Sequence, residues 1–462
     1  MVKAEEILAK IERGEPVEYK NVIVEGDLDL SKVVLPTEQV KRDEYEKSLN
    51  INGTSKIVSA PIRITHSEIL GHINFANTVI RATLDFSCTI FNGKNDNFHN
   101  VEFRKNAYFL GAEFHGNVLF LKSHFNEYVG FEQVKFYGEI TTFNNTTFKN
   151  ANFFETKFIG ECKFCDAKFN EYASFWGAHF TEKTDFNYAR FFNGTTFIDA
   201  KFSKSVYFWM ALFVGLSDFS NVQFNGVADF MGAQFDGYVT FYYTMSDEAY
   251  LFNNVRFNSE LTLIKSRFNY IEIEWDSIKD CLVYDGAVYL KLIKNFRSLE
   301  QLDDADNCYY RYRRESQSRK NWYNETKGWI HRFDWSKLYD HIAWRSCGYG
   351  VRPSFTIACI LGFIFGFASL YHVFSGIARS APPEIAMKLL DKSTLLFTFA
   401  FGNADALSFW ECLYFSAMAL TGRIPEGLHP IGAWKYAVML ESVLGYLFFA
   451  LFVVVLARKM IR

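Results

Sequence analysis

Residues 164–202 read FCDAKFNEYASFWGAHFTEKTDFNYARFFNGTTFIDAKF and contain the pattern that decides the fold of the N-terminal part of the chain. Phenylalanine stands at positions 164, 169, 175, 180, 186, 191, 197 and 202, so steps of five and six residues alternate. A small residue stands two positions before every second Phe, as Ala167, Ala178, Ala189 and Ala200 show. The repeating unit is therefore F-x-x-A-x-F followed by five spacer residues.

The same period runs outward from this stretch in both directions, from about Ile64 to Phe268. Large apolar residues recur almost every eleven positions, and nearly every one is followed five residues later by another. Neither an α-helix nor a flat strand has this period, whereas a solenoid whose short strands turn a corner every five or six residues does. The large side chains are expected to stack inward. Ser246 stands where Phe is expected after Phe241, which predicts a bulge at this unit.

This pattern resembles the pentapeptide-repeat family, in a Phe-rich variant, over roughly Ile23–Phe268. The resemblance implies a right-handed quadrilateral β-helix, which we expect over residues 21–275 with an inserted segment at about 36–60. Residues 1–20 are predicted to form a capping helix, because Ile7, Leu8 and Ile11 share one helical face and Gly14 and Pro16 follow them.

A helical linker is predicted at residues 286–353, because apolar residues recur at 288, 289, 292, 293, 296 and 299. A second, arginine-rich helix is expected to follow and to run through Arg319. The amphipathic and aromatic segment Trp329–Trp344 then fits a helix at a membrane surface. The arginines suit either lipid phosphates or an ordinary solvated helix face, and the sequence leaves both interpretations open.

Two apolar segments near the C-terminus are long enough to cross a bilayer. Ser354–Phe374 contains no Asp, Glu, Lys or Arg, and the run Tyr436–Ala457 is closed by basic residues. We expect membrane spans at 354–374 and 433–457. Between them, an apolar pattern at 408–420 is too short to cross, and a polar loop broken by Gly and Pro follows at 421–430. This order predicts a re-entrant helix and loop, which membranes tolerate where protein or water surrounds them.

The segment from about Ser354 to the C-terminus is similar to two-transmembrane ion channels of the potassium-channel superfamily. Laid on the usual filter LTTVGYGDLYP, residues 420–430 read LTGRIPEGLHP, so the first and last positions agree but the filter glycines do not. Ile424 and Glu426 stand where that family has Gly. A ladder of backbone carbonyls needs those glycines. The resemblance therefore implies a pore of weak or unusual selectivity, lined by Thr421, Gly422, Arg423, Ile424, Pro425, Glu426 and Gly427.

Four residues outside this loop are further candidates. Trp410 and Glu411 belong to the predicted pore helix, and Glu441 lies within the last predicted span. Ionisable groups at membrane depth are costly and usually functional. Gly445 lies in the middle of the same span, where it suits a gating hinge or close packing against a neighbouring helix.

A two-span subunit cannot enclose a pore alone, so we expect a homo-oligomer, and the resemblance implies a tetramer. The expected partners are permeant ions, membrane lipids and a cytoplasmic protein or small ligand on the β-helix. The N-terminus carries no apolar signal region, and Arg352 and Arg458 flank the spans. These features predict a multi-pass protein of the cell (plasma) membrane with the β-helix and the C-terminus in the cytoplasm.

Several classes of function are not expected. The net charge is −3 with 22% charged residues, so nucleic-acid binding is not predicted. Cys162 and Cys165 form a lone CxxC. Because Cys162 occupies an inward position of the repeat, we expect it to be a core residue and not a metal ligand. No phosphate-binding loop, nucleophile–base pair or metal-ligand cluster is evident, so neither an enzyme nor a cofactor is predicted. The alternative to a channel is a non-conducting, membrane-tethered scaffold whose β-helix binds a cytoplasmic protein.

Overall fold

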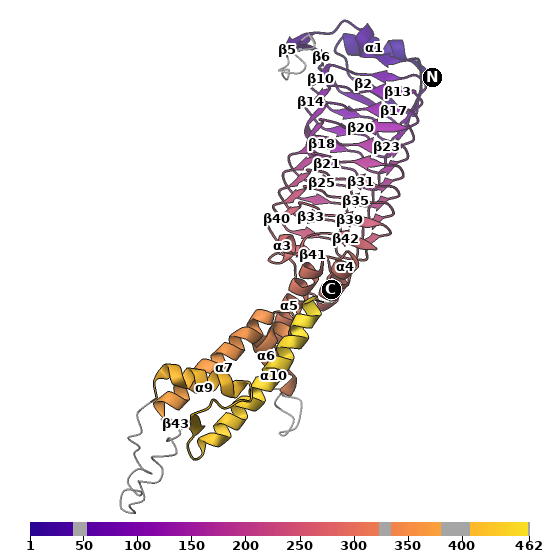
Figure 1. Cartoon of the computed structure of the whole chain (residues 1–462). Helices are drawn as coiled ribbons and strands as arrows, with labels where there is room; N and C mark the ends of the chain where they lie inside the picture. The colour runs from indigo at the N-terminus through magenta and orange to yellow at the C-terminus, as the bar shows by residue number, and fades with distance from the viewer. Residues whose placement is uncertain (40–52, 323–333, 380–406, 461–462) are drawn as a thin grey trace, which may run out of the picture. The chain divides into compact units, whose positions relative to one another are not determined.

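The computed structural model describes residues 1–39, 53–322, 334–379 and 407–460. They form two compact units, Met1–Ala305 and Asp306–Arg462. The first is a β-solenoid of about 12 turns, and the second is a helical region with two long apolar helices (Figure 1). The sequence therefore predicted the solenoid and the helical C-terminal region correctly.

Short strands of the solenoid stack into sheets of 11, 20 and 11 strands. The first 11-stranded sheet contains β1 (Val2–Lys3), β3 (Ile23–Glu25), β8 (Glu68–Ile69), β12 (Ile90–Phe91), β16 (Glu113–Phe114), β19 (Lys135–Phe136), β22 (Lys157–Phe158), β26 (His179–Phe180), β30 (Lys201–Phe202), β34 (Gln223–Phe224) and β38 (Met245–Ser246). The second contains β4 (Leu28–Asp29), β9 (Ile73–Asn74), β13 (Asn95–Asn97), β17 (Asn117–Leu119), β20 (Ile140–Thr142), β23 (Glu161–Lys163), β27 (Thr184–Asp185), β31 (Val206–Tyr207), β35 (Ala228–Asp229), β39 (Ala249–Leu251) and β42 (Tyr270–Glu272).

The 20-stranded sheet contains β2 (Val17–Lys20), β5 (Thr37–Gln39), β6 (Thr54–Val58), β7 (Ile62–Thr65), β10 (Thr78–Ile80), β11 (Leu84–Asp85), β14 (Glu102–Phe103), β15 (Ala107–Tyr108), β18 (His124–Gly130), β21 (Thr147–Asn152), β24 (Lys168–Phe169), β25 (Ala173–Ser174), β28 (Arg190–Phe191), β29 (Thr195–Thr196), β32 (Leu212–Phe213), β33 (Ser217–Asp218), β36 (Gln234–Phe235), β37 (Val239–Thr240), β40 (Arg256–Phe257) and β41 (Leu261–Thr262). It holds two stacks of strands that join where the longer strands β18 and β21 pair. Within the solenoid, β5 and β6 pair antiparallel, whereas the strands that stack from turn to turn are parallel.

The register of the stacked strands explains the sequence period. Phe158 pairs with Phe180, and Phe180 pairs with Phe202, so each turn returns to the same side chain. The rings of Phe153 and Phe175 stack with centroids 4.8 Å apart, and those of Phe175 and Phe197 lie 4.7 Å apart. These separations equal the spacing of neighbouring strands, about 4.8 Å. Each fully buried ring contributes about 1.5–3 kcal/mol relative to exposure, so the Phe columns form the core.

The predicted bulge at Phe241–Ser246 is wrong. Met245 and Ser246 pair in register with Gln223 and Phe224, and the fully buried Tyr250 lies with its ring 5.6 Å from that of Phe224. The large Tyr side chain thus packs where the missing Phe leaves space. A register shift occurs instead between β18 and β21, at Phe125–Tyr128, where β18 has one residue more than its partner.

Helices cover both ends of the first unit. At the start, α1 (Ala4–Glu12) buries Ala4, Ile7, Leu8 and Ile11, and it is shorter than the predicted segment 1–20, because β2 joins a sheet. A short 3₁₀ turn, η1 (Leu30–Lys32), follows β4. Part of the predicted insertion at 36–60 forms β5 and β6, and its residues 40–52 lie outside the described residues.

At the other end of the solenoid lie α3 (Trp275–Ile278) and α4 (Gly286–Ser298). The buried Asn295 of α4 accepts a hydrogen bond from the backbone N–H of Ile271 and donates one to its carbonyl, at 2.9 and 2.8 Å. This side chain thereby satisfies both backbone groups of a residue in the last strand, β42. The first helix of the predicted linker therefore closes the solenoid.

The second unit consists mainly of helices. Its elements are α5 (Leu302–Arg319, which begins in the first unit), α6 (Trp335–Cys347), η3 (Gly348–Gly350), α7 (Pro353–Val373), β43 (Ile377–Arg379), α9 (Phe409–Leu420), β44 (Leu428–Pro430) and α10 (Trp434–Met460). Among the described residues, α7 and α10 are the helices long and apolar enough to cross a membrane, and α9 is a shorter apolar helix. They coincide, within a few residues, with the segments expected at 354–374, 433–457 and 408–420.

Candidate functional site

Helices α7, α9 and α10 enclose a common apolar core in the second unit. Its buried members are Ala368, Tyr371, Ile377, Leu407, Cys412, Phe415, Ala419 and Val438. The rings of Tyr371 and Phe415 meet edge to face at 5.6 Å, a favourable geometry for aromatic pairs. The short helix α9 is therefore packed against both long helices.

A capping box begins α9. Ser408 accepts a hydrogen bond from the N–H of Glu411, and the Glu411 carboxylate accepts one from the N–H of Ser408. The same carboxylate pairs with Arg379 of β43. These contacts lower the pKa of Glu411. The hydrogen bond from Arg379 has the largest effect, and the hydrogen bonds from Ser408 come next. Glu411, predicted as a pore-helix residue, thus fixes the start of α9, while Trp410 beside it is exposed.

The predicted filter loop begins with a helix cap. Gly422 has a φ of +78° and donates to the carbonyl of Ala419, and Arg423 donates to that of Met418. This pair of bonds is the Schellman arrangement that ends many helices, and its left-handed position favours Gly. Gly422 therefore serves to end α9 at Leu420, with Thr421 as the capping residue.

The rest of the loop returns to the first long helix. β44 pairs antiparallel with β43, and Ile431 donates its backbone N–H to the carbonyl of Gly376 at 2.9 Å. Of the predicted pore-lining residues, Pro425 is buried, whereas Thr421, Gly422, Arg423, Ile424, Glu426 and Gly427 are exposed. The exposed positions thus follow the end of α9 in sequence on both sides of the buried proline.

Gly445 permits a close approach between α9 and α10. A β-carbon at this position would lie 1.9 Å from the backbone oxygen of Leu420. Nearby, Ser442 donates its hydroxyl to the carbonyl of Ala419 at 2.8 Å. This geometry accounts for the glycine by packing, one of the two roles considered above, and the hinge role stays a prediction.

A buried polar cluster joins all three helices. Glu441 of α10 is 0% exposed and accepts a hydrogen bond at 2.7 Å from the hydroxyl of Tyr371 of α7. Ser416 of α9 bonds both the Glu441 carboxyl and, at 3.0 Å, the carbonyl of Ile364 of α7. Sequence analysis selected Glu441 but missed Tyr371 and Ser416. The signal for them was a polar side chain inside an apolar run.

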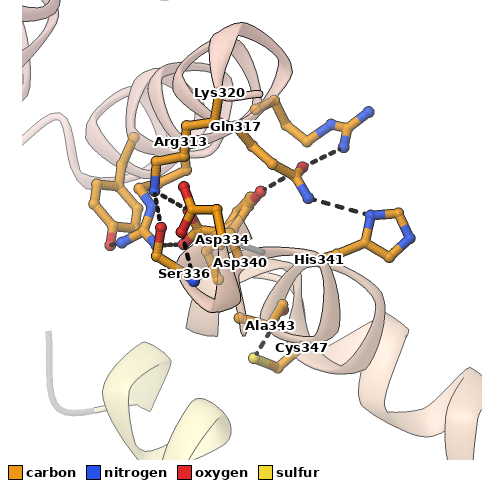
Figure 2. Close-up of polar contacts among 12 residues, drawn as sticks. Arg313, Gln317, Lys320, Asp334, Ser336, Asp340, His341, Ala343 and Cys347 are labelled. Carbon is orange, nitrogen blue, oxygen red and sulfur yellow. Dashed lines mark hydrogen bonds and ion pairs between the residues drawn. The ribbon is translucent and has the colours of Figure 1, made fainter. Parts of the chain in front are cut away.

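A second polar cluster lies between α5 and α6 (Figure 2). Asp340 of α6 accepts hydrogen bonds from Arg313 at 2.5 Å and from Lys320 at 2.6 Å. Burial raises the pKa of Asp340, but these two cations more than offset it and lower the pKa overall. Gln317, which points between the helices in Figure 2, bonds His341 at 3.2 Å.

The arginines of this region pack on aromatic rings. The guanidinium of Arg314 lies 3.7 Å from the ring centroid of Trp344, and that of Arg313 lies 4.9 Å from Tyr349. Arg352 lies 5.2 Å from the ring of Tyr310. Stacking on an aromatic face is a common role of arginine. Arg313 and Arg314 thus pack on rings, whereas Arg311 and Arg319 of the same helix are exposed, as on a solvated face, and the interpretation as lipid-phosphate contacts stays a prediction.

Helix α5 contacts one end of each long helix. Arg352, which precedes α7, donates to Asn307 of α5 at 2.6 Å. Arg458, near the end of α10, pairs with Asp306 at 3.7 Å and lies 5.7 Å from the ring of Tyr309. The start of α7 and the end of α10 are thereby linked through adjacent residues of α5.

The solenoid offers less evidence of a site. Cys162 is buried, and burial raises the pKa of Cys165 to about 12, so both side chains remain thiols. Among the residues that the structure describes, no group of three or more His, Cys, Asp or Glu could hold a metal. A shallow cavity of about 330 Å³ is lined partly by the rings of Tyr128, Phe154, Tyr172 and Trp176.

Comparison with known proteins agrees with the repeat architecture. Residues 197–245 match the family model described as Pentapeptide repeats (9 copies). Neither the curated proteins nor the solved structures that were compared contain a match. The matched segment spans strands in all three sheets of the solenoid. The match and the β-solenoid together support the assignment of the N-terminal part of the chain as a pentapeptide-repeat structure.

Proposed function

We propose that the chain is the subunit of an oligomeric ion channel whose pore is formed by α9, the loop at 421–427 and α10. The observation that carries this proposal is the position of α9. This apolar helix of 12 residues is too short to cross a bilayer, yet it packs between two helices of sufficient length. A short helix followed by an exposed polar loop suits a re-entrant pore element.

The long helices need an apolar environment that one subunit does not supply. Only 17% of the most apolar window of α7 and 22% of that of α10 are buried inside the chain. Large exposed apolar side chains on these two helices include Ile357, Leu361, Phe365, Leu370, Val373, Met439, Leu440, Val443, Leu447, Val453 and Val454. Exposed apolar side chains in such number mark an interface with lipid or with other subunits.

The remaining features of the proposal follow from this arrangement. A ring of subunits encloses the pore, four-fold as in the channels that the sequence resembles, with rings of Arg423 and Glu426 side chains acting on the permeant ion. Arg352 and Arg458, gathered at one end of the bundle by α5, favour a cytoplasmic position for that end, in the cell membrane. The solenoid follows the right-handed quadrilateral path of pentapeptide-repeat proteins and lies in the cytoplasm.

Helix α6 is proposed to lie at the lipid surface beside the spans. Trp335, Tyr339 and Ile342 share one helical face and are 59%, 66% and 54% exposed. The opposite face bears Asp340, which bonds to α5. Trp and Tyr favour the interface between membrane and water, and the next long helix, α7, is the first proposed span. Signals from the solenoid then reach the pore through α5, which contacts α6 and both spans.

The test is current through the purified full-length protein in planar lipid bilayers, with cation and anion gradients imposed separately. We expect discrete openings, and we expect the reversal potential to change in Arg423→Glu and in Glu426→Gln. Ile198→Ser, a substitution in the solenoid, is the matched control and should leave the reversal potential unchanged. Membrane-inserted protein that carries no current under any gradient would contradict the proposal.

The second candidate is a membrane-tethered scaffold that does not conduct. Exposed aromatic side chains on the solenoid favour it, namely Tyr172, Trp176, Tyr188, Phe192, Trp209, Tyr242 and Tyr243, with exposed fractions between 38% and 47%. Such residues are enriched at protein interfaces. Silent bilayers together with a protein complex that Trp176→Ala and Trp209→Ala abolish would favour the scaffold over the channel.

A further inference from the structure

We propose that Glu441 carries a proton in the folded subunit and that this proton fastens α9 to α7, which makes the channel current sensitive to pH. This inference deepens the proposed channel function and rests on it. Its starting point is the buried cluster of Tyr371, Ser416 and Glu441, whose members come from the three helices α7, α9 and α10.

Counting the hydrogens in this cluster distinguishes two states of Glu441. The hydroxyl of Ser416 has a single hydrogen but two possible acceptors, the Glu441 carboxyl and the carbonyl of Ile364. When Glu441 is protonated, it donates to Ser416, and Ser416 donates to Ile364. Tyr371 donates to the other carboxyl oxygen, so every contact of the cluster is a hydrogen bond.

An ionised Glu441 changes this pattern. Its carboxylate cannot donate, so the Ser416 hydrogen must turn to it, and the bond from Ser416 to Ile364 is lost. That bond joins α9 to α7. The hydroxyl of Ser442 of α10 keeps its contact with the carbonyl of Ala419 at the end of α9, at 2.8 Å, and shares its hydrogen with the carbonyl of Val438 in its own helix, at 3.0 Å. Loss of the proton therefore removes one hydrogen bond between α9 and α7 and loosens α9 against α7, while the apolar contacts between these two helices remain.

The surroundings of Glu441 favour the protonated state. The titratable side chains packed against the site are Tyr371 from α7 and Cys412 from α9, both neutral groups in an apolar core. His372 of α7 bonds the carbonyl of Leu407 instead. Among the described residues, no Lys, Arg or His forms an ion pair with Glu441. A buried carboxylate without a cation is costly, so the neutral acid is the more stable form.

Infrared spectroscopy of the full-length protein in lipid vesicles tests the proton directly. We expect a carboxylic acid C=O band at pH 7 that is weaker in Glu441→Gln. Asp96 is a second buried carboxyl, so Asp96→Asn is the matched control and should retain the part of the band that Glu441→Gln removes. If Glu441→Gln leaves the band unchanged at pH 7, Glu441 is ionised and the inference is overturned.

Bilayer currents of the same protein between pH 6 and pH 10 test the role of α9. We expect open probability to change roughly fivefold or more across this range in the wild type, the lower end of typical coupling between sites. Glu441→Gln, which cannot lose a proton, and Ser416→Ala, which lacks the bond to Ile364, should remove this dependence. Ser416→Ala should retain the carboxylic acid band. A pH dependence that survives in Ser416→Ala would overturn the fastening role of this serine.

The two proposals fail in different ways. Current that is present but independent of pH in the wild type contradicts the inference and leaves the channel function intact. Silence of all variants contradicts the channel function, and the infrared band then still decides whether Glu441 holds a proton.

Discussion

The backbone oxygen of Leu420, the last residue of α9, lies against Gly445 of α10, where a β-carbon would come within 1.9 Å of it. We expect Gly445→Ala to separate the two helices and to destabilise the protein by about 1–3 kcal/mol, as overpacking of cores does. Thermal unfolding of the purified protein in detergent, followed by circular dichroism, measures this loss.

Gly362→Ala in α7 is the matched control for that substitution, because nothing lies within 4 Å of a β-carbon built there. Its melting temperature should equal or exceed that of the wild type, since Ala favours the helix over Gly. A pure hinge at Gly445 predicts another result, a shifted open probability at an unchanged melting temperature. That outcome would rule out the packing role.

Asp96 provides a prediction about pH and stability. Its side chain is fully buried in the solenoid, where one oxygen accepts a hydrogen bond from the N–H of Ile73 and the other has no hydrogen-bond partner among the described residues. Burial raises the pKa of Asp96 to about 7. Between about pH 4 and 7 the folded chain keeps a proton that the unfolded chain loses, so stability falls as pH rises through this window.

Asp96→Asn should remove the loss of folding stability that the ionisation of Asp96 causes. We expect the variant to unfold at higher temperature than the wild type at pH 8, with an advantage that grows from pH 5 and reaches at most about 4 kcal/mol above pH 7. The exposed Asp247→Asn is the control and should behave as the wild type does. Equal melting curves for wild type and Asp96→Asn at pH 5 and pH 8 would show that folding does not raise the pKa of Asp96.

The solenoid could be predicted from the sequence because each turn needs a large apolar side chain at the same place in its core. Phe153, Phe175 and Phe197 occupy equivalent places in successive turns, so their spacing alone reveals the fold. The bulge predicted at Ser246 failed because Tyr250, four residues later, fills the space, and such compensation leaves no periodic signal.

The candidate site was less accessible to sequence analysis. Its polar contacts join residues far apart in the chain, such as Tyr371 and Glu441 or Arg379 and Glu411, and no local pattern records such pairs. The resemblance to channel filters drew attention to Gly422 as part of a pore. In the structure Gly422 caps the end of α9. A glycine directly after a helix is a common sequence signal for such a cap.

The exposed face of α6 yields a prediction about lipids. If Trp335 lies at the membrane surface, brominated lipids in reconstituted vesicles should quench its fluorescence. We expect the quenched part of the emission to fall in Trp335→Phe. Trp176→Phe, in the solenoid, is the control and should leave it unchanged. Equal quenching of wild type and Trp335→Phe would indicate that another subunit or water covers this face.

The contacts of α5 yield a prediction about how motion would reach the proposed pore. Asp306 pairs with Arg458 near the end of α10, and Asn307 accepts from Arg352 before α7. Replacing both α5 residues by Ala should weaken the attachment of both helix ends, because Arg458 and Arg352 then keep only their contacts with aromatic rings of α5. We expect faster hydrogen exchange of the backbone amides of Val455 and its neighbours, and an altered open probability, in the double variant.

Arg311→Ala is the control for this prediction, because it removes only an exposed ion pair within α5, and it should change neither the exchange rate nor the open probability. If exchange near Val455 stays at the wild-type rate in the double variant, α5 does not hold α10, and the proposed route from the solenoid through α5 is contradicted.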